Sequence, residues 1–181
     1  MDTPPKKYSR FSIAMHWLMV ILIVLVYATI ELKGNFPKDS EPRNIMKQLH
    51  FMLGLTVLLL ALIRLAARLF ITKVPPITPK PSPLVLGSAH LVHVLLYGLM
   101  IGLPILGWTL LSAAGKPIPF WGVDLPSLVA ANKELVGNVK FWHETLANWG
   151  YALIGLHAVA ALYHHYWVKD DTLLRMMPKR K

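Results

Sequence analysis

The chain has 181 residues, of which 55% are apolar, and it carries a mean hydropathy of +0.48 and a formal net charge of +10. Such a balance exceeds the apolar share of ordinary soluble domains and indicates a protein of the lipid bilayer. The absence of cysteine excludes disulfides, iron–sulfur clusters and covalent haem attachment. Because the basic residues lie at the ends of apolar segments, we attribute the charge to membrane topology and expect no nucleic-acid partner.

Four apolar segments are each long enough to cross a bilayer, which takes about 20 residues. They cover residues 11–32, 44–70, 85–112 and 141–168. The first follows a basic N-terminus, but it is too long for a signal peptide and has no small-residue cleavage site before Glu31, so we interpret it as a retained span. The predicted fold is therefore all-α, a single integral membrane four-helix bundle over residues 1–181.

The links between these spans indicate how the bundle is oriented. The proline-rich link 71–84 cannot continue either neighbouring helix. The link 113–140 is the longest, and we expect it to fold over the membrane surface. Lysine and arginine are concentrated on the side that holds both termini and the link 71–84, so the positive-inside rule predicts that both termini are cytoplasmic.

Histidine is the residue type that points to chemistry. An ionisable side chain inside a bilayer costs free energy and normally faces the bundle interior with a partner. A lone histidine of this kind is as often a structural hydrogen-bonding group as a ligand, but several at matching depths favour ligation. All eight histidines lie in or beside the apolar spans: His16, His50, His90, His93, His143, His157, His164 and His165.

Two histidines share one face of the fourth span. His143 and His157 are 14 residues apart, which corresponds to about 40° around a helix and about 21 Å along it. Each is therefore placed to ligate a separate haem along the same helix. Six-coordinate electron-transfer haems take an axial ligand on each side, so each needs a second histidine from a facing helix.

Depth in the bilayer selects the partners. His16 lies early in the first span, which starts inside, and matches the depth of His157. His50 lies early in the second span, which starts outside, and matches the depth of His143. We predict that His16 and His157 bind the iron of an inner haem b, and that His50 and His143 bind that of an outer haem b. Small residues near these positions would leave clearance for a flat macrocycle: Gly54, Ala147 and Gly150.

The other polar residues of the spans leave alternatives open. His90 and His93 could replace His16 as the inner ligand, or hydrogen-bond a haem propionate or a quinone carbonyl. His164 and His165 lie near the water boundary and are interpreted as interfacial or proton-relay residues. Four cations could pair with propionates or serve only as positive-inside and snorkelling residues: Lys47, Arg64, Arg68 and Lys140.

The chain resembles the bacterial cytochrome b561 family of small dihaem membrane proteins along nearly its whole length. The four positions predicted here as ligands coincide with the haem-ligating positions of that family. The segments that carry the resemblance are Tyr8-Ser-Arg10, Ile13 to Trp17, Ala89 to His93, His143 to Asn148, Gly150-Tyr151, Gly155 to Ala158, His164 to Tyr166, and Leu173 to Pro178.

The resemblance implies a multi-pass protein of the bacterial inner membrane with two haem b groups. It also implies oxidation of superoxide to dioxygen on the periplasmic face and reduction of ubiquinone in the membrane. An anionic substrate would be steered by cations, for which we expect Lys116, Lys133 and Lys140 of the third link to serve.

Two other functions compete with this interpretation. A haem-bearing membrane anchor would pass electrons for a partner dehydrogenase or hydrogenase, and either protein could also form a homodimer. A proton-coupled transporter would use the histidines as a relay, but it leaves the 14-residue spacing unexplained and would call for carboxylates inside the spans, where only Glu144 is a candidate.

Overall fold

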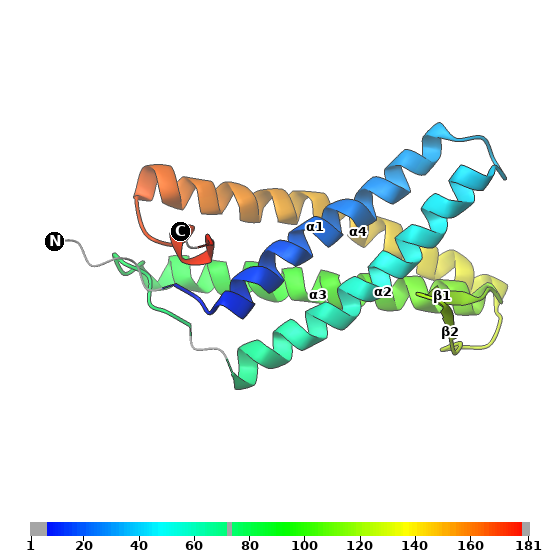
Figure 1. Ribbon diagram of the computed structural model, residues 1–181, viewed down its shortest axis with the longest axis horizontal. Helices are drawn as coiled ribbons and strands as arrows, with labels where there is room; N and C mark the ends of the chain where they lie inside the picture. The colour runs from blue at the N-terminus through cyan, green and yellow to red at the C-terminus, as the bar shows by residue number, and fades with distance from the viewer. Residues whose placement is uncertain (1–6, 72–73, 179–181) are drawn as a thin grey trace.

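The computed structural model describes residues 7–71 and 74–178 and consists mainly of four long helices (Figure 1). In the view of Figure 1, α3 and α4 run along the long axis of the molecule, and α1 and α2 cross them diagonally. All four are long and apolar enough to cross a membrane, so the predicted four-span helical bundle is confirmed. The helices are α1 (Arg10–Leu32), α2 (Glu41–Phe70), α3 (Pro83–Ala113) and α4 (Lys133–Tyr163).

Polar caps define where the helices begin. The side chain of Ser9 accepts a hydrogen bond from the backbone of Ser12 at the start of α1, and Ser82 caps α3 in the same way. Asn132 caps α4 by accepting from the backbone N–H of Leu135 at 3.1 Å. Helix α4 therefore starts about two turns before the apolar segment at residue 141. Its first turns carry polar side chains, which hydropathy alone does not assign to a span.

The third link contains the only strands in the described part of the chain. Strands β1 (Ile118–Phe120) and β2 (Val123–Leu125) pair antiparallel, with Ile118 opposite Leu125. Trp121 and Gly122 form the turn with φ of 45° and 95°, the left-handed values that a tight two-residue hairpin requires. The turn is held by a hydrogen bond of 2.9 Å from the Trp121 indole to the Thr56 hydroxyl. This link packs against α2 and α3 at one end of the bundle, called here the hairpin end.

The opposite end of the bundle holds both ends of the described chain and is called here the terminal end. The backbone N–H of Tyr8 donates to the carbonyl of Arg175 at 3.2 Å, and the indole of Trp17 donates to the carbonyl of Met176 at 2.9 Å. A chain that crosses the bilayer an even number of times has both of its ends on the same side. Several of the basic residues behind the predicted cytoplasmic orientation lie outside the described residues: Lys6, Lys73, Lys179, Arg180 and Lys181.

Short helical turns connect the long helices. Helix α1 continues into a 3-10 turn, η1 (Lys33–Asn35), and α4 into a π-helical turn, η2 (His164–Val168). The C-terminal segment then returns toward the bundle through η3 (Leu174–Met176).

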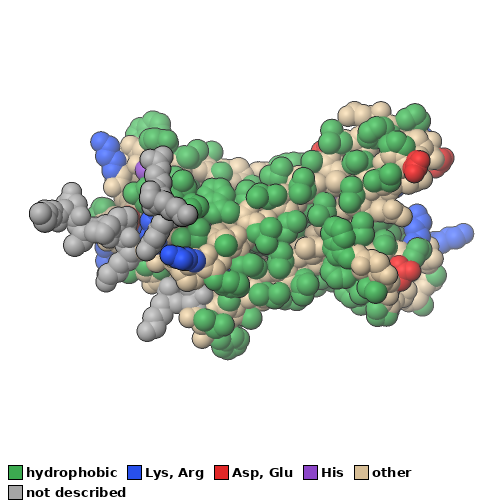
Figure 2. Space-filling model, in the orientation of Figure 1, with side chains coloured by type: hydrophobic (Ala, Val, Ile, Leu, Met, Phe, Trp, Pro, Cys, Tyr) green, Lys and Arg blue, Asp and Glu red, His purple; other side chains and the backbone are tan. Residues whose placement is uncertain are grey.

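Apolar side chains cover most of the middle of the bundle, including its outward faces. Figure 2 shows hydrophobic side chains over the central part of the face in view, with charged side chains gathered at the two ends. The buried interior is small and consists of two clusters, which is the pattern expected when lipid rather than water surrounds a bundle. One cluster holds Leu55, Leu58, Leu111 and Ile118; the other holds Met19, Val57 and Ala61.

Gly150 allows α1 to approach α4 closely. A Cβ atom at this position would overlap the hydroxyl group of Tyr27, which donates a hydrogen bond of 2.8 Å to the carbonyl of Ala147. The Tyr27 ring also lies 4.4 Å from the ring of Tyr151, centroid to centroid. We had expected Gly150 to leave room for a macrocycle, but in the structure Tyr27 fills that space.

We expect Gly150→Ala to lower the stability of the bundle by about 1–3 kcal/mol, the usual cost of overpacking a tight contact. Thermal unfolding of the detergent-purified protein measures the change. Adding Tyr27→Phe should recover part of the loss, because the clash is with the hydroxyl group. Gly155→Ala is the matched control, since a Cβ atom at Gly155 meets nothing within 4 Å. Equal effects at Gly150 and Gly155 would contradict the assignment.

Candidate functional site

The structure brings the four predicted histidines together as two pairs. The ring centroids of His50 and His143 are 6.3 Å apart, with the rings inclined at 76°. Those of His16 and His157 are also 6.3 Å apart, inclined at 73°. Each pair joins a different helix to α4, and these are the pairings that depth in the bilayer predicted.

The pairs occupy opposite ends of the bundle. His50 lies in the first half of α2 and His143 in the first half of α4, and both helices begin at the hairpin end. His16 follows the start of α1 and His157 precedes the end of α4, so this pair lies toward the terminal end. Helix α4 therefore links the two pairs and fixes their axial separation.

The pair at the hairpin end is arranged for ligation. The Nδ1 atom of His50 lies 3.0 Å from the carbonyl oxygen of Val26, which can only accept, so Nδ1 carries the proton and Nε2 keeps a free lone pair. A backbone carbonyl that orients the second ring nitrogen is the usual outer partner of a metal-bound histidine.

The pair at the terminal end has a cation beside it. A guanidinium nitrogen of Arg64 lies 3.3 Å from Nδ1 of His16, and the same guanidinium lies 5.9 Å from the ring centroid of Tyr97. Because arginine only donates, His16 accepts through Nδ1 and its neutral ring carries the proton on Nε2. Ligation through Nε2 would therefore require the proton to move and Arg64 to turn to another acceptor.

The other histidines separate into distinct environments. The ring of His93 lies 5.4 Å from that of His157, so the structure places both His16 and His93 beside His157. His90 is exposed at the start of α3. His164 and His165 lie in the π-helical turn beyond α4.

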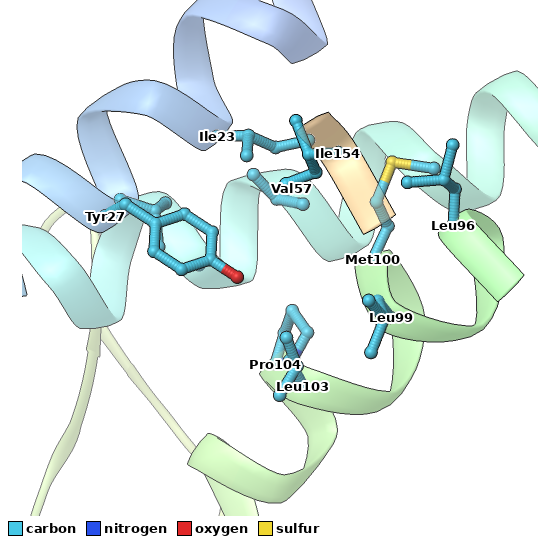
Figure 3. Close-up of a pocket in the computed structure, with 11 residues that line it drawn as sticks. Ile23, Tyr27, Val57, Leu96, Leu99, Met100, Leu103, Pro104 and Ile154 are labelled. Carbon is cyan, nitrogen blue, oxygen red and sulfur yellow. The ribbon is translucent and has the colours of Figure 1, made fainter. Parts of the chain in front are cut away.

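A largely apolar cavity lies between the two pairs (Figure 3). It encloses about 480 Å³ of empty space, part of it open to the surroundings. Tyr27 and Val26, the residue that hydrogen-bonds His50, contribute to its wall, and Gly54 opens it further because a Cβ atom there would meet nothing within 4 Å. None of the four paired histidines is among the residues that line it. The remaining wall is formed by Ile23, Val57, Leu96, Leu99, Met100, Leu103, Pro104 and Ile154.

The side chains available at the two histidine pairs indicate which kind of metal group could bind there. Within residues 7–71 and 74–178, no cluster of three or more histidine, cysteine or carboxylate side chains is present that would hold a bare metal ion. Two imidazoles on one iron need ring centres roughly 6 Å apart, from about 2 Å per metal–nitrogen bond plus about 1 Å within each ring. Both pairs meet this spacing. They therefore fit a haem iron, whose remaining four ligands come from the porphyrin.

Several cations lie near one another at the hairpin end, and the sequence analysis had singled out two of them, Lys47 and Lys140, as possible partners of haem propionates. Lys33 interacts electrostatically with Arg43, Lys47 and Lys140, and with His50 itself. The nearest opposing charge is Glu144, which lies 3.9 Å from Lys140 in an exposed ion pair. We call Lys33, Arg43, Lys47 and Lys140 the cation cluster.

The expected steering residues only partly match this cluster. Lys140 belongs to it, whereas Lys116 and Lys133 are exposed and are not among the residues that interact with Lys33. Sequence reasoning missed Lys33 and Arg43 because it searched only the third link. The signal was present in the basic residues that flank the first link, residues 33–43.

Comparison with known proteins identifies relatives over almost the whole chain. A family model described as prokaryotic cytochrome b561 matches residues 7–179. The chain is 44% identical to a protein of Yersinia pestis named "Probable superoxide oxidase CybB", covering 97% of this chain and 98% of that protein. It is 40% identical to "Cytochrome b561 homolog 1" of Escherichia coli, over 97% and 99% of the two chains. It is also 32% identical to "Cytochrome b562" of Cereibacter sphaeroides, over 96% of each.

The paired arrangement predicts which histidine substitutions act together. We expect His50→Ala and His143→Ala to remove the same one of two haems, and His16→Ala and His157→Ala to remove the other. Pyridine-haemochrome quantification per chain, with the reduced-minus-oxidised spectrum, measures this. His165→Ala should retain both haems. Retention of both haems in any of the four variants would contradict the ligand assignment at that position.

Proposed function

Because this chain belongs to the prokaryotic cytochrome b561 family of haem b membrane proteins, we propose that it oxidises superoxide and transfers the electrons through two haems to ubiquinone. The observation that carries the proposal is the presence of two histidine pairs along α4. The ring centroids are 6.3 Å apart in both pairs. Each haem b supplies a site that accepts and gives up a single electron. His50 and His143 would hold one group, and His16 and His157 the other.

The histidine pairs determine what kind of chemistry is open to the protein. With both histidines of a pair holding one haem iron, no coordination position would remain for dioxygen or superoxide, so electrons would pass without a bond between substrate and metal. This arrangement favours rapid electron transfer over oxygen binding. The hydrogen bond from His50 to the Val26 carbonyl would keep the ring in its ligating orientation through repeated changes of redox state.

Charge favours the hairpin end as the place where superoxide approaches. The proposed substrate is an anion, and Lys33, which interacts with the other three cations of the cluster, also interacts with His50. Fields of this kind raise the association rate of small charged ligands and weaken as ionic strength rises. The predicted topology places the hairpin end in the periplasm and both termini in the cytoplasm. The activity named for the Yersinia pestis relative supports the same substrate.

Purified protein tests the proposal directly. We expect two haems per chain, reduction of those haems by superoxide, and reduction of a water-soluble ubiquinone that depends on superoxide. Haem without this activity would instead favour a membrane anchor for a partner dehydrogenase. A colourless protein would refute both functions.

The cation cluster yields a more specific expectation. Replacing Lys33, Lys47 and Lys140 with Gln should slow haem reduction by superoxide by roughly tenfold or more at low salt, the lower range of electrostatic steering effects. The difference in rate between this variant and the wild type should shrink as salt is added, because salt screens the attraction that the wild-type lysines exert on superoxide. Stopped-flow absorbance of the haems provides the rate.

A matched variant with Gln at Lys116 and Lys133 should behave almost as wild type. It removes exposed lysines that lie outside the cluster. If this variant loses as much rate as the cluster variant, the effect is one of total charge and the cluster has no special role.

A further inference from the structure

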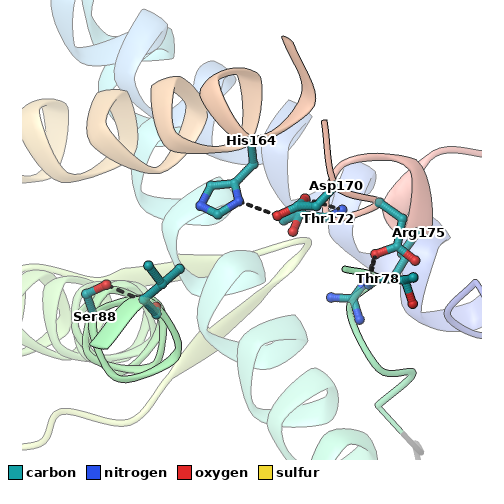
Figure 4. Close-up of polar contacts among 8 residues, drawn as sticks. Thr78, Ser88, His164, Asp170, Thr172 and Arg175 are labelled. Atoms are coloured by element: carbon teal, nitrogen blue, oxygen red, sulfur yellow. Dashed lines mark hydrogen bonds and ion pairs between the residues drawn. The ribbon is translucent and has the colours of Figure 1, made fainter. Parts of the chain in front are cut away.

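Two adjacent histidines at the terminal end have different surroundings. In His164, Nδ1 lies 2.5 Å from a carboxylate oxygen of Asp170 (Figure 4), and the side chain is 20% exposed. The ring of His165 instead packs edge-on against Tyr166, with centroids 4.8 Å apart. The π-helical turn and the left-handed Lys169, with φ of 57°, return the chain so that Asp170 faces back to His164. π-Helical turns inside helices are often found at functional sites.

Asp170 is held as a buried carboxylate. It is only 3% exposed, and it accepts a hydrogen bond of 2.9 Å from the backbone of Thr172. Burial by itself raises the pKa of this carboxyl group, but hydrogen bonds donated by Thr172 and His164 outweigh it and hold the pKa below its usual value. Asp170 is therefore ionised at neutral pH. Its charge keeps the proton of His164 on Nδ1 and leaves Nε2 free to exchange a second proton.

The segment that follows anchors Asp170. The backbone N–H of Thr78 donates to Asp171 at 2.9 Å, and the backbone N–H of Asp171 donates to the Thr78 carbonyl at 3.1 Å. Arg175 donates to the carbonyl of Pro75 and forms an ion pair of 3.7 Å with Asp171. These contacts join the C-terminal segment to the link between α2 and α3. They hold the carboxylate of Asp170 rigidly in place without using it themselves.

The position of His164 relates it to the pair at the terminal end. It follows His157 by seven residues, which at helical spacing is about 20° around the axis and about 10 Å along it. The residues one turn beyond His157 on that face are Ala160 and Ala161, both of which have small side chains. A group that receives electrons at the His16–His157 pair would therefore lie within reach of His164.

We infer that His164 and Asp170 form a proton-donating dyad that serves the acceptor reduced at the terminal end. The inference rests on the proposed function. Two superoxide ions give up one electron each and become two dioxygen molecules; the quinone takes both electrons and two protons and becomes the quinol. Each proton passes from His164 Nε2 to a quinone oxygen, and water at the exposed edge of His164 replaces it. Asp170 stays ionised throughout.

The terminal end carries other charged and titratable groups besides the dyad. In the C-terminal segment, Asp171 and Arg175 pair with each other. Beside His164 on its own element, Tyr163 lies 6.1 Å away ring to ring, and Lys169 is exposed. At the start of α3, His90 is exposed.

The test separates the electron step from the proton step in the haem-loaded protein. Superoxide mixed with oxidised protein reports electron entry, and ubiquinone-1 mixed with reduced protein reports electron exit. We expect His164→Gln to slow haem reoxidation by ubiquinone-1 by at least about tenfold, which is less than the factor that a general acid typically contributes to a rate. Haem reduction by superoxide needs no proton and should be unchanged. Asp170→Asn should impair the same step.

The adjacent His165→Gln is the matched control and should leave both steps at wild-type rates. Two further measurements exclude a purely structural role. Added imidazole should partly restore the exit step in His164→Ala, and heavy water should slow that step alone in the wild-type protein. Equal exit rates in His164→Gln and His165→Gln, or a solvent isotope effect on neither step, would overturn the dyad. A His164 variant that loses haem and is slowed equally in both steps would also overturn the dyad.

These outcomes are distinct from failure of the proposed function. Wild-type haems that stay reduced in the presence of ubiquinone-1 would refute the acceptor itself, and the dyad's role with it. If ubiquinone-1 reoxidises the wild-type haems and reoxidises those of His164→Gln at the same rate, only the dyad is refuted.

Discussion

The structure depends on one constraint, which is that an ionisable side chain in the bilayer needs a partner. In this bundle the four paired histidines face one another across the helix interfaces, with ring centres 6.3 Å apart in both pairs. That spacing is too wide for a direct hydrogen bond between the rings and suits an iron atom between them. The polar groups that are costly in lipid are thus the same groups that the proposed haems would satisfy, and haem binding at these pairs would be coupled to bundle assembly.

The helix crossing follows from the same requirement. Helix α1 reaches α4 where Gly150 admits Tyr27, and there the Tyr27 hydroxyl bonds the Ala147 carbonyl. The preceding residue, Val26, presents its carbonyl to His50. One close contact between two helices therefore orients His50, a proposed haem ligand, on a third. Because the buried apolar clusters are small, such specific contacts carry more of the packing than they would in a soluble bundle.

The sequence was sufficient to predict the four spans, because hydropathy marks them along the chain. The four predicted histidines do lie as two facing pairs, but His93 also lies beside His157, so the choice of inner ligand stays a prediction. The sequence was insufficient for lateral position. Depth could not show that Tyr27 occupies the space beside Gly150, or that Lys33 lies near Lys140 while Lys116 does not. It also missed the first turns of α4, whose polar residues are helical because Asn132 caps them. Nor could the sequence show that His164, and not His165, contacts Asp170, because adjacent residues of a helical turn point in different directions.

The two ends of the bundle differ in a way that matches a one-directional electron carrier. In the proposed reaction superoxide releases an electron and no proton, so the entry end would need attraction for an anion, which the cation cluster at the hairpin end, with Lys33 beside His50, would provide. Reduction of a quinone consumes protons, so the exit end needs a group that can donate them repeatedly. The described residues place a histidine–carboxylate pair beyond His157, at the terminal end. Electron flow from the hairpin end to the terminal end is the direction in which each end meets the chemical requirement of its own reaction.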